Sequence, residues 1–271
     1  MDLSDLLATP VALPSLPRTV ALLSTELSAS EPLLSRLVPL FASDPVLTAR
    51  LLMLANAPLY QMTGRIGGIA EALMLLAPQR LQALVQAAQQ GGAARSVPGV
   101  DLQAFWRYSQ QTARLARSLA SLVRYNPSHA YAVGLIHGLG EWVIHLQAPD
   151  SAATLNLRLG PLDPRRAGLE QKMWGFAYSE VSAGLARRWQ LPAHLIAALQ
   201  HMQAPLAREA CEPLAGLLHL AAWRVRARHA ALGAPALAVS FPGEVGEALG
   251  LDMDMVLQQD PIDWSVPERD A

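Results

Sequence analysis

One segment, YAVGLIHGLGEWVIH (residues 131–145), carries two histidines and a glutamate, residue types that could do chemistry. His137, Glu141 and His145 stand at i, i+4 and i+8, so an unbroken helix would place them along one stripe. Imidazole and carboxylate groups ligate transition metals, and a bound metal activates water for hydrolysis. Three ligands from one helix drift around its axis, however, and Gly138 interrupts the pattern. We interpret His137 as a helix residue that hydrogen-bonds a neighbour, and keep a residual metal hydrolase on these three residues as an alternative.

Composition favours a folded protein without a strong overall charge. The chain has 271 residues, of which 52% are hydrophobic, and its formal net charge is -1. A large core is therefore available, whereas no overall field would hold nucleic acid or an anionic membrane. Cys211 is the sole cysteine, which excludes an internal disulfide and a cysteine-rich metal site. The acidic start MDLSDLL and the short apolar runs lack the features of a secretory signal or a membrane span, so we expect a soluble, cytoplasmic protein with neither nucleic-acid nor membrane partners.

Apolar residues recur at helical spacing through almost the whole chain, and alternating strand-like runs are rare. This pattern predicts an all-α fold. SEPLLSRLVPLF and SDPVLTARLLMLAN each begin with an N-cap serine (Ser30 and Ser43), an acidic residue and a proline, which is a helix-start signal. The longest helix is expected in residues 101–127, and Ser128 is expected to cap the next one.

Glycines and prolines gather between residues 90 and 101, in QQGGAARSVPGV. They mark the clearest internal boundary of the chain. We therefore divide it into two helical subdomains, 1–95 and 96–230, which are followed by a C-terminal extension, 231–271.

Several blocks, in order and in register, resemble the HDOD family, the HD-related output domains of bacterial signalling proteins. The first half carries LPSLPRTV, SDPVLTARLLMLANAPLY and RIGGIAEALMLLAPQRL, and the second carries FWRYSQQTARLAR, AYAVGLIHGLGEWVI and GFAYSEVSAGLARRWQLP. The likeness runs from about Leu13 to Pro205. It implies two packed helical subdomains, the second of them HD-like, and a role in bacterial signal transduction, usually without demonstrated catalysis.

The resemblance also locates a degenerate metal site. An HD phosphohydrolase holds its metal with histidines and aspartates from several helices, but most of the matching positions here carry other residues. The vestigial site consists of Tyr108, His137, Gly138, Tyr178, His201 and Ala222, with Met202 and Gln203 where paired histidines would stand. Only His137 is in place, and we expect the two tyrosines to fill the volume of a metal cluster. We therefore expect no metal, no cofactor and no enzyme activity.

The function that this reading favours is non-catalytic signal transduction through protein–protein interaction, with signalling proteins as partners. Asp44, Asn56 and Tyr60 in the HDOD-specific half are candidates for a partner surface. Asp44 is equally a helix-start residue and Asn56 a helix stop, which gives both a structural alternative.

A receptor for a nucleotide second messenger is the alternative from another class. Its ligand would lie in the degenerate pocket near Tyr108, His137 and Tyr178, and Arg107 and Arg114 would supply charge at the rim. An open pocket with convergent donors would favour this reading, whereas a packed tyrosine plug would exclude it.

A further cationic segment, WRVRARH, lies near the end of the second subdomain. It places Arg224 and Arg228 one turn apart and Arg226 on another side of the helix. These cations either stabilise a helix C-terminus or form a small patch for an anion or a partner.

Overall fold

The structure is a computed structural model that describes residues 1–60, 64–90, 96–207 and 212–259. Across these ranges the chain is all-α, without a strand, which confirms the predicted fold class. Cys211, residues 91–95 of the predicted boundary and residues 260–271 of the predicted extension lie outside the described residues.

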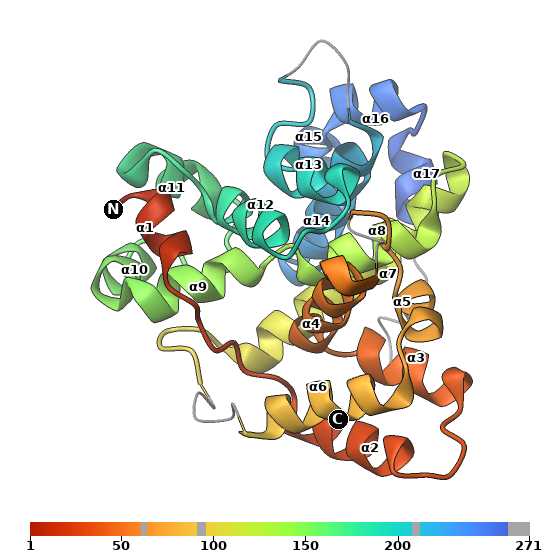
Figure 1. Ribbon diagram of the computed structural model, residues 1–271. Coiled ribbons are helices and arrows are strands. Elements are labelled where there is room, and N and C mark those ends of the chain that lie inside the picture. The colour runs from red at the N-terminus through yellow and green to blue at the C-terminus, as the bar shows by residue number, and fades with distance from the viewer. Residues whose placement is uncertain (61–63, 91–95, 208–211, 260–271) are drawn as a thin grey trace.

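The first half of the chain forms a group of short helices around α4, as Figure 1 shows. Leu47 and Leu51 of α4 are fully buried, because this helix is surrounded by its neighbours. The elements of this half are α1 (Leu3–Ala8), α2 (Pro17–Leu27), α3 (Leu34–Ala42), α4 (Pro45–Ala55), the 3-10 turn η1 (Pro58–Tyr60), α5 (Ile69–Leu75) and α6 (Pro78–Gln90).

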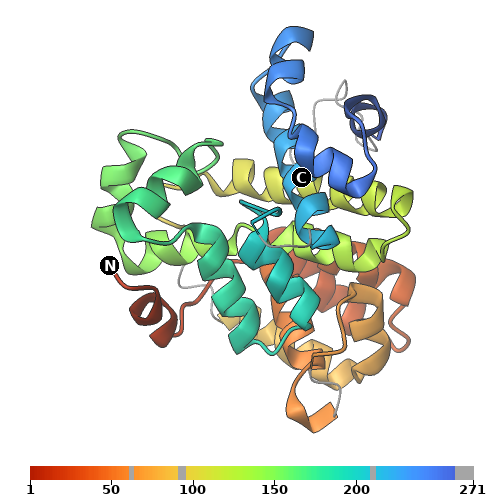
Figure 2. The ribbon, with the colours of Figure 1, turned by 90° about the horizontal axis from the view of Figure 1, so that it is seen from above.

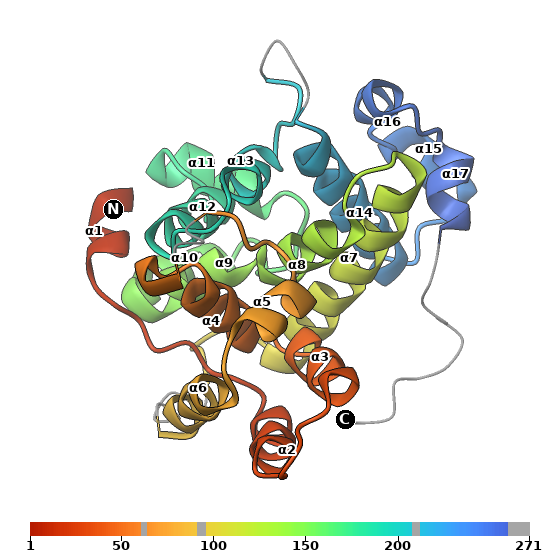
Figure 3. The same cartoon turned by 45° about the vertical axis from the view of Figure 1, so that its right-hand side comes forward.

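The second half is built on α7 and α8, which lie side by side in Figures 1 and 3. As predicted, α7 is the longest helix among the described residues. The elements of this half are α7 (Leu102–Leu122), α8 (Pro127–Ile136), α9 (Leu139–Gln147), α10 (Pro149–Asn156), α11 (Arg166–Trp174), α12 (Tyr178–Arg188), α13 (Ala193–His201) and α14 (Pro213–His229).

Three helix starts differ from the sequence prediction. The N-cap of α4 is Asp44 rather than Ser43, because the Asp44 carboxylate accepts hydrogen bonds from the first free backbone N–H groups of that helix. Asn126, not Ser128, caps α8 in the same way. The third helix begins at Leu34, several residues after Ser30, without a side-chain cap. In each case the residue that precedes the helical backbone decides the start.

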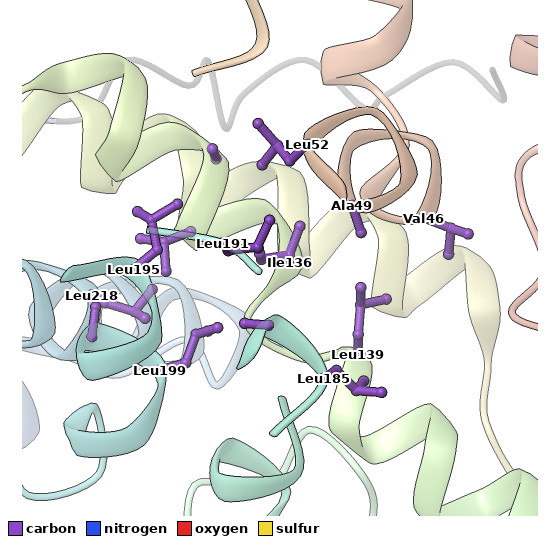
Figure 4. Close-up of a cluster of buried hydrophobic side chains, with 14 of the residues drawn as sticks. Val46, Ala49, Leu52, Ile136, Leu139, Leu185, Leu191, Leu195, Leu199 and Leu218 are labelled. Carbon is purple, nitrogen blue, oxygen red and sulfur yellow. The ribbon is translucent and has the colours of Figure 1, made fainter. Parts of the chain in front are cut away.

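The two halves share one continuous core. Figure 4 shows the α4 side chains Val46, Ala49 and Leu52 in the same buried cluster as Ile136 and Leu139 of the second half. The N-terminal helix α1 lies against α9 and α12, so the first residues of the predicted 1–95 subdomain pack on the second half. Both observations describe two groups of helices joined through a common interior.

The predicted extension contains three short helices, α15 (Ala234–Ser240), α16 (Gly243–Leu249) and α17 (Met253–Gln258). They lie beside α14, as Figures 2 and 3 show, and α16 and α17 contact it. Val245, Leu251 and Val256 are buried in this contact region. The described part of the extension therefore packs on the body of the protein.

Membrane-spanning potential is confined to one bent pair of helices. Within the described part of the chain, no single helix is long and apolar enough to cross a bilayer. Helices α3 and α4 reach that length and apolarity only together, and the chain bends by 119° between them.

Candidate functional site

A pocket of about 1300 Å³ lies beside the degenerate metal site and is lined by three residues of that site, Tyr108, His201 and Ala222. Helices α11, α13 and α14 contribute much of its wall, and Tyr108 of α7 lines it together with His201, Gln203 and Ala222. Ser240 and Pro242 of the C-terminal extension line it as well. Tyr108 forms part of the wall and Tyr178 is buried outside the lining, so the expectation that the two tyrosines fill the volume of a metal cluster stays a prediction.

His137 is buried behind this wall and does not line the pocket. Its Nδ1 lies 2.6 Å from the Gly134 carbonyl oxygen, which can only accept, so Nδ1 carries the proton. The ring packs edge-on against Tyr108, with 5.1 Å between centroids, and Nε2 has no partner among the described residues. Burial lowers the pKa of His137 to about 4, so the imidazole is neutral near pH 7.

The aspartate that would complete a His-Asp pair has no room. A Cβ atom at Gly138 would overlap the ring of Phe105. Helix α8 ends at Ile136 and α9 begins at Leu139, so the predicted stripe through His137 breaks at this glycine. The described residues contain no group of three or more His, Cys, Asp or Glu side chains that could hold a metal ion.

Arg226 is the most buried of the three cationic residues that line the pocket, the others being Arg165 and Lys172. Its Nη2 donates to the Tyr178 hydroxyl at 3.0 Å, and the same hydroxyl accepts from Gln203 Nε2 at 3.0 Å. The guanidinium carbon lies 5.4 Å from the centroid of the Tyr108 ring. None of the described ion pairs includes Arg226, and its Nε has no described hydrogen-bond partner. A permanent positive charge therefore faces the cavity with neutral hydrogen-bond and ring partners, and the nearest acidic influence is the longer-range field of Asp163.

Sequence reasoning placed the anion-binding potential on Arg224 and Arg228 and missed Arg226. The signal that would have found it is its spacing from Ala222, the position that resembles the last metal-binding aspartate. Arg226 follows Ala222 by four residues in α14, so both lie on one helix face, and both line the pocket.

A second buried polar cluster joins α9 and α11 and accounts for Glu141 and His145. Arg166, which is fully buried, donates to Glu141 Oε1 at 2.6 Å and to Glu170 Oε1 at 3.0 Å. His145 Nε2 lies 3.1 Å from Glu141 Oε1, and its Nδ1 lies 2.7 Å from the Pro98 carbonyl oxygen. These contacts tie both residues to an arginine rather than to a metal.

The cluster holds two carboxyl groups against one arginine. Burial, with the neighbouring Glu141 charge, raises the pKa of Glu170 to about 9. Burial also raises the pKa of Glu141 and lowers that of His145. Near pH 7 the two carboxyl groups therefore retain one proton between them, and the single remaining negative charge balances Arg166.

The two arginines predicted at the pocket rim lie elsewhere. Arg107 is exposed on α7 and does not line the pocket. Arg114 lines a different hollow, where α3 and α5 meet α7 and α8. Neither side chain supplies charge to the degenerate site.

The predicted partner surface in the HDOD-specific half is also not formed as expected. Asp44 and Asn56 are both fully buried, so a partner cannot touch them. Asp44 caps α4 and accepts from the Leu16 backbone N–H, and burial raises its pKa to about 6. The Asn56 side chain joins the end of α4 to Ile66 through hydrogen bonds of 2.8 and 3.1 Å. Tyr60 is partly buried against the core.

The comparisons with known proteins define the class of this chain. The HDOD domain family matches residues 13–205, which is more than half of the chain. The protein therefore belongs to the HDOD family, as the resemblance indicated. A relative of Treponema pallidum (strain Nichols), an uncharacterized protein, is 27% identical over 217 residues that cover 79% of this chain and 42% of the relative. The chain thus spans less than half of that relative's length.

Solved structures with the same fold come from several bacteria. The MmoQ response regulator of Methylococcus capsulatus has a TM-score of 0.72 at 21% identity, over 92% of this chain and 98% of its own. A virulence factor of Campylobacter jejuni subsp. jejuni has a TM-score of 0.70 at 22% identity, over 96% of both chains. An HDOD domain protein of Geobacter sulfurreducens has a TM-score of 0.54 at 21% identity, over 95% of this chain and 91% of its own. At such identities these likenesses establish the fold.

Proposed function

We propose that this HDOD protein is a non-catalytic regulator of bacterial signal transduction that acts through protein–protein interaction. Membership of the HDOD family and the fold shared with a response regulator support the signalling role. The observation that supports the non-catalytic part is Arg226, because its guanidinium stands in a pocket that Tyr108, His201 and Ala222 of the vestigial metal site also line.

The charge of the pocket disfavours a divalent cation. A divalent cation in this pocket would meet the fixed positive charge of Arg226 and would find tyrosine and alanine where ligands are needed. Glu180 lines the same pocket, but its carboxylate accepts from the Ala177 backbone N–H at 2.7 Å and caps α12. A pocket of this charge favours anions over metal ions.

Hydrolysis of a generic phosphodiester, bis(p-nitrophenyl) phosphate, tests the non-catalytic claim. The purified chain is assayed with Mg²⁺, Mn²⁺ or Zn²⁺, beside the variant His137→Ala. We expect no metal-dependent turnover above the buffer rate in either protein. Turnover that requires both the metal and His137 would overturn the proposal and favour the residual hydrolase.

The interaction half of the proposal is tested in the native cell. In-cell cross-linking of the tagged chain, followed by mass spectrometry, should recover the same signalling protein in repeated experiments. Mixing the two purified proteins should then reproduce the complex. Recovery of the chain without any reproducible, directly binding partner would contradict this part.

A second function, receptor for a nucleotide second messenger, is favoured by the open pocket and by the charge of Arg226, which forms no ion pair among the described residues. Cyclic dinucleotides carry phosphate charges that a guanidinium pairs well, and bases that stack on an aromatic ring such as Tyr108. Titration calorimetry with cyclic di-GMP and cyclic di-AMP should show binding that falls by about 10- to 100-fold in Arg226→Met, the loss of a charge-assisted hydrogen bond. Arg107→Met, which removes an exposed charge from α7, is the matched control.

A further inference from the structure

A second hollow, of about 350 Å³, lies where the two halves of the protein meet. Helices α3 and α5 form one side, and α7 and α8 form the other, as Figure 3 shows. Two hydrogen bonds join these sides, from Gln110 Nε2 to the Ser43 carbonyl oxygen at 2.7 Å and from the Tyr131 hydroxyl to the Ala42 carbonyl oxygen at 2.9 Å. All four residues line the hollow, so its walls are held in place by the protein itself.

The charge of this hollow comes from Arg114 and Arg117 of α7, which lie three residues apart on one face of the helix. Arg114 is half-buried and Arg117 is exposed. The Arg117 guanidinium carbon lies 5.2 Å from the centroid of the Tyr131 ring. Burial raises the pKa of Tyr131, and the positive charges of both arginines oppose this rise, so both lie close to the same side chain. Two cations therefore converge on one side of the hollow.

Neither cation has an acidic partner among the described residues. No acidic residue of the described chain lines the hollow, and neither arginine takes part in a described ion pair. Glu71, which follows the wall residue Ala70 in α5, is engaged elsewhere, because its carboxylate accepts from the Gly68 backbone N–H at 3.1 Å and lies 3.5 Å from His129 Nε2. The hollow thus holds a positive charge that an anionic ligand would balance.

The charge and the walls of the hollow together select a class of ligand. A phosphate monoester carries about −1.5 to −2 charges at pH 7 and three acceptor oxygens, which matches two guanidinium groups, whereas one carboxylate would balance only one of them. Val38, Pro39 and Ile69 form an apolar wall, and the Tyr131 ring adds aromatic surface. The volume lies at the lower end of the range for small-molecule sites, about 300–1,000 Å³. The hollow therefore suits a phosphoryl group attached to a small apolar or aromatic body.

We propose that this hollow is a binding site for a phosphate monoester, whose phosphoryl group pairs with Arg114 and Arg117 and whose ester group packs on the apolar wall. The site shares no lining residue with the Arg226 pocket, so it does not depend on a ligand in that pocket. Because helices of both halves line the hollow, a ligand there contacts both and stabilises the junction between them.

Titration calorimetry of the full chain with phenyl phosphate tests this site at low ionic strength, where a charge interaction is least screened. We expect binding to the wild type that falls by about 10- to 100-fold in the double variant Arg114→Met, Arg117→Met, through the loss of charge-assisted contacts. The matched control is Arg80→Met, Arg107→Met, which removes two exposed arginines outside the hollow and leaves the same net charge. Phenyl sulfate, which has the same ring and a single charge, should bind the wild type more weakly than phenyl phosphate.

Two further titrations separate the sources of such a ligand, one with a short phosphotyrosine peptide and one with adenosine monophosphate. Tighter binding of the peptide would identify a phosphorylated side chain of a partner protein. Tighter binding of the mononucleotide would identify a free phosphate ester. In either case the affinity should fall in the double variant, because both sources share the phosphoryl contact.

Four results would overturn the site. The first is no binding of phenyl phosphate to the wild type at millimolar concentration, and the second is equal affinity in the wild type and the double variant. The third is an equal loss in the matched control, which would show a general effect of net charge. The fourth is binding that is lost in Arg226→Met and kept in the double variant, which would place the ligand in the other pocket. Should the double variant unfold, Arg117→Met alone decides, because this exposed side chain should still contribute about five- to tenfold in affinity.

Discussion

Two arginines in the HD-like half, Arg166 and Arg226, illustrate two different uses of a buried cation. Arg166 donates to Glu141, Glu170 and Asn156 and to the Leu159 carbonyl oxygen, so its charge and its donors are satisfied inside the protein. Arg226 has the neutral Tyr178 hydroxyl and the Tyr108 ring instead, and it faces an open pocket. A cation that is paired with buried carboxylates, such as Arg166, stabilises the fold. A cation that forms no described ion pair and faces a cavity, such as Arg226, can pair with an anionic ligand.

The largest loss of stability is expected at Arg166, whose charge is balanced by buried carboxylates. Arg166→Met leaves Glu141 and Glu170 buried without their cation, so the free energy of unfolding should fall by about 3–5 kcal/mol. Urea denaturation followed by circular dichroism measures it. Arg165→Met, at an exposed neighbour, should leave stability nearly unchanged, because its ion pair with Asp163 is screened by solvent. Equal losses in the two variants would remove the distinction between the buried cluster and a surface ion pair.

A smaller loss is expected from an attempt to rebuild the metal site beside the pocket. Gly138→Asp restores the His-Asp pair, but the new side chain would overlap Phe105, which should cost about 1–3 kcal/mol without creating metal binding. Gly160→Asp is the matched control, because a Cβ there meets nothing within 4 Å and Gly160 does not line the pocket. Thermal unfolding and metal analysis of both variants check this, and a stable Gly138→Asp protein that retains metal would contradict the account.

The pH dependence of stability tests whether the two carboxyl groups beside Arg166 retain a proton. The pKa of Glu170 is raised to about 9, so above the ordinary pKa of a glutamate the folded state binds more protons than the unfolded state. The free energy of unfolding should therefore fall as pH rises from 7 towards 9, by at most about 1.4 kcal/mol per pH unit. Asp44 and His137 titrate below this window. Denaturation at several pH values should show this slope in the wild type and a flatter one in Glu170→Gln; equal slopes would count against a proton on this pair.

The smallest effect on stability is expected at Arg226, which forms no ion pair among the described residues. Arg226→Met removes a charge that forms no ion pair among the described residues and keeps most of the side-chain volume, so stability should stay within about 1 kcal/mol of the wild type. The same denaturation series measures it beside Arg166→Met. A loss as large as that of Arg166→Met would show that Arg226 is a structural residue, and the contrast between the two arginines would fail.

The sequence was sufficient for the family, the all-α class and the long helix α7, because apolar periodicity and several blocks in register carry that information. It was not sufficient for the site. Whether two tyrosines fill a cavity depends on how far apart the surrounding helices lie, which no local pattern records. The buried polar cluster around Arg166 was missed for a related reason, because Arg166 and Glu141 are 25 residues apart and meet only in the folded chain.

The helix starts and the roles of buried polar residues also could not be decided from the sequence. Ser43 and Asp44 both precede Pro45 and both belong to residue types that cap helices, and the backbone conformation of Asp44 decides between them. Asp44 and Asn56 also fit both a surface and a structural role by sequence, and their burial removes the surface role.

Elemental analysis tests the central claim most directly, that Arg226 has taken the place of a metal ion in the degenerate HD pocket. The purified, tag-free chain is incubated with Mn²⁺, Zn²⁺ or Ni²⁺, desalted and measured beside His137→Ala and Arg226→Met. The account predicts no stoichiometric metal in the wild type or in His137→Ala. About one metal ion per wild-type chain that is lost in His137→Ala would contradict it.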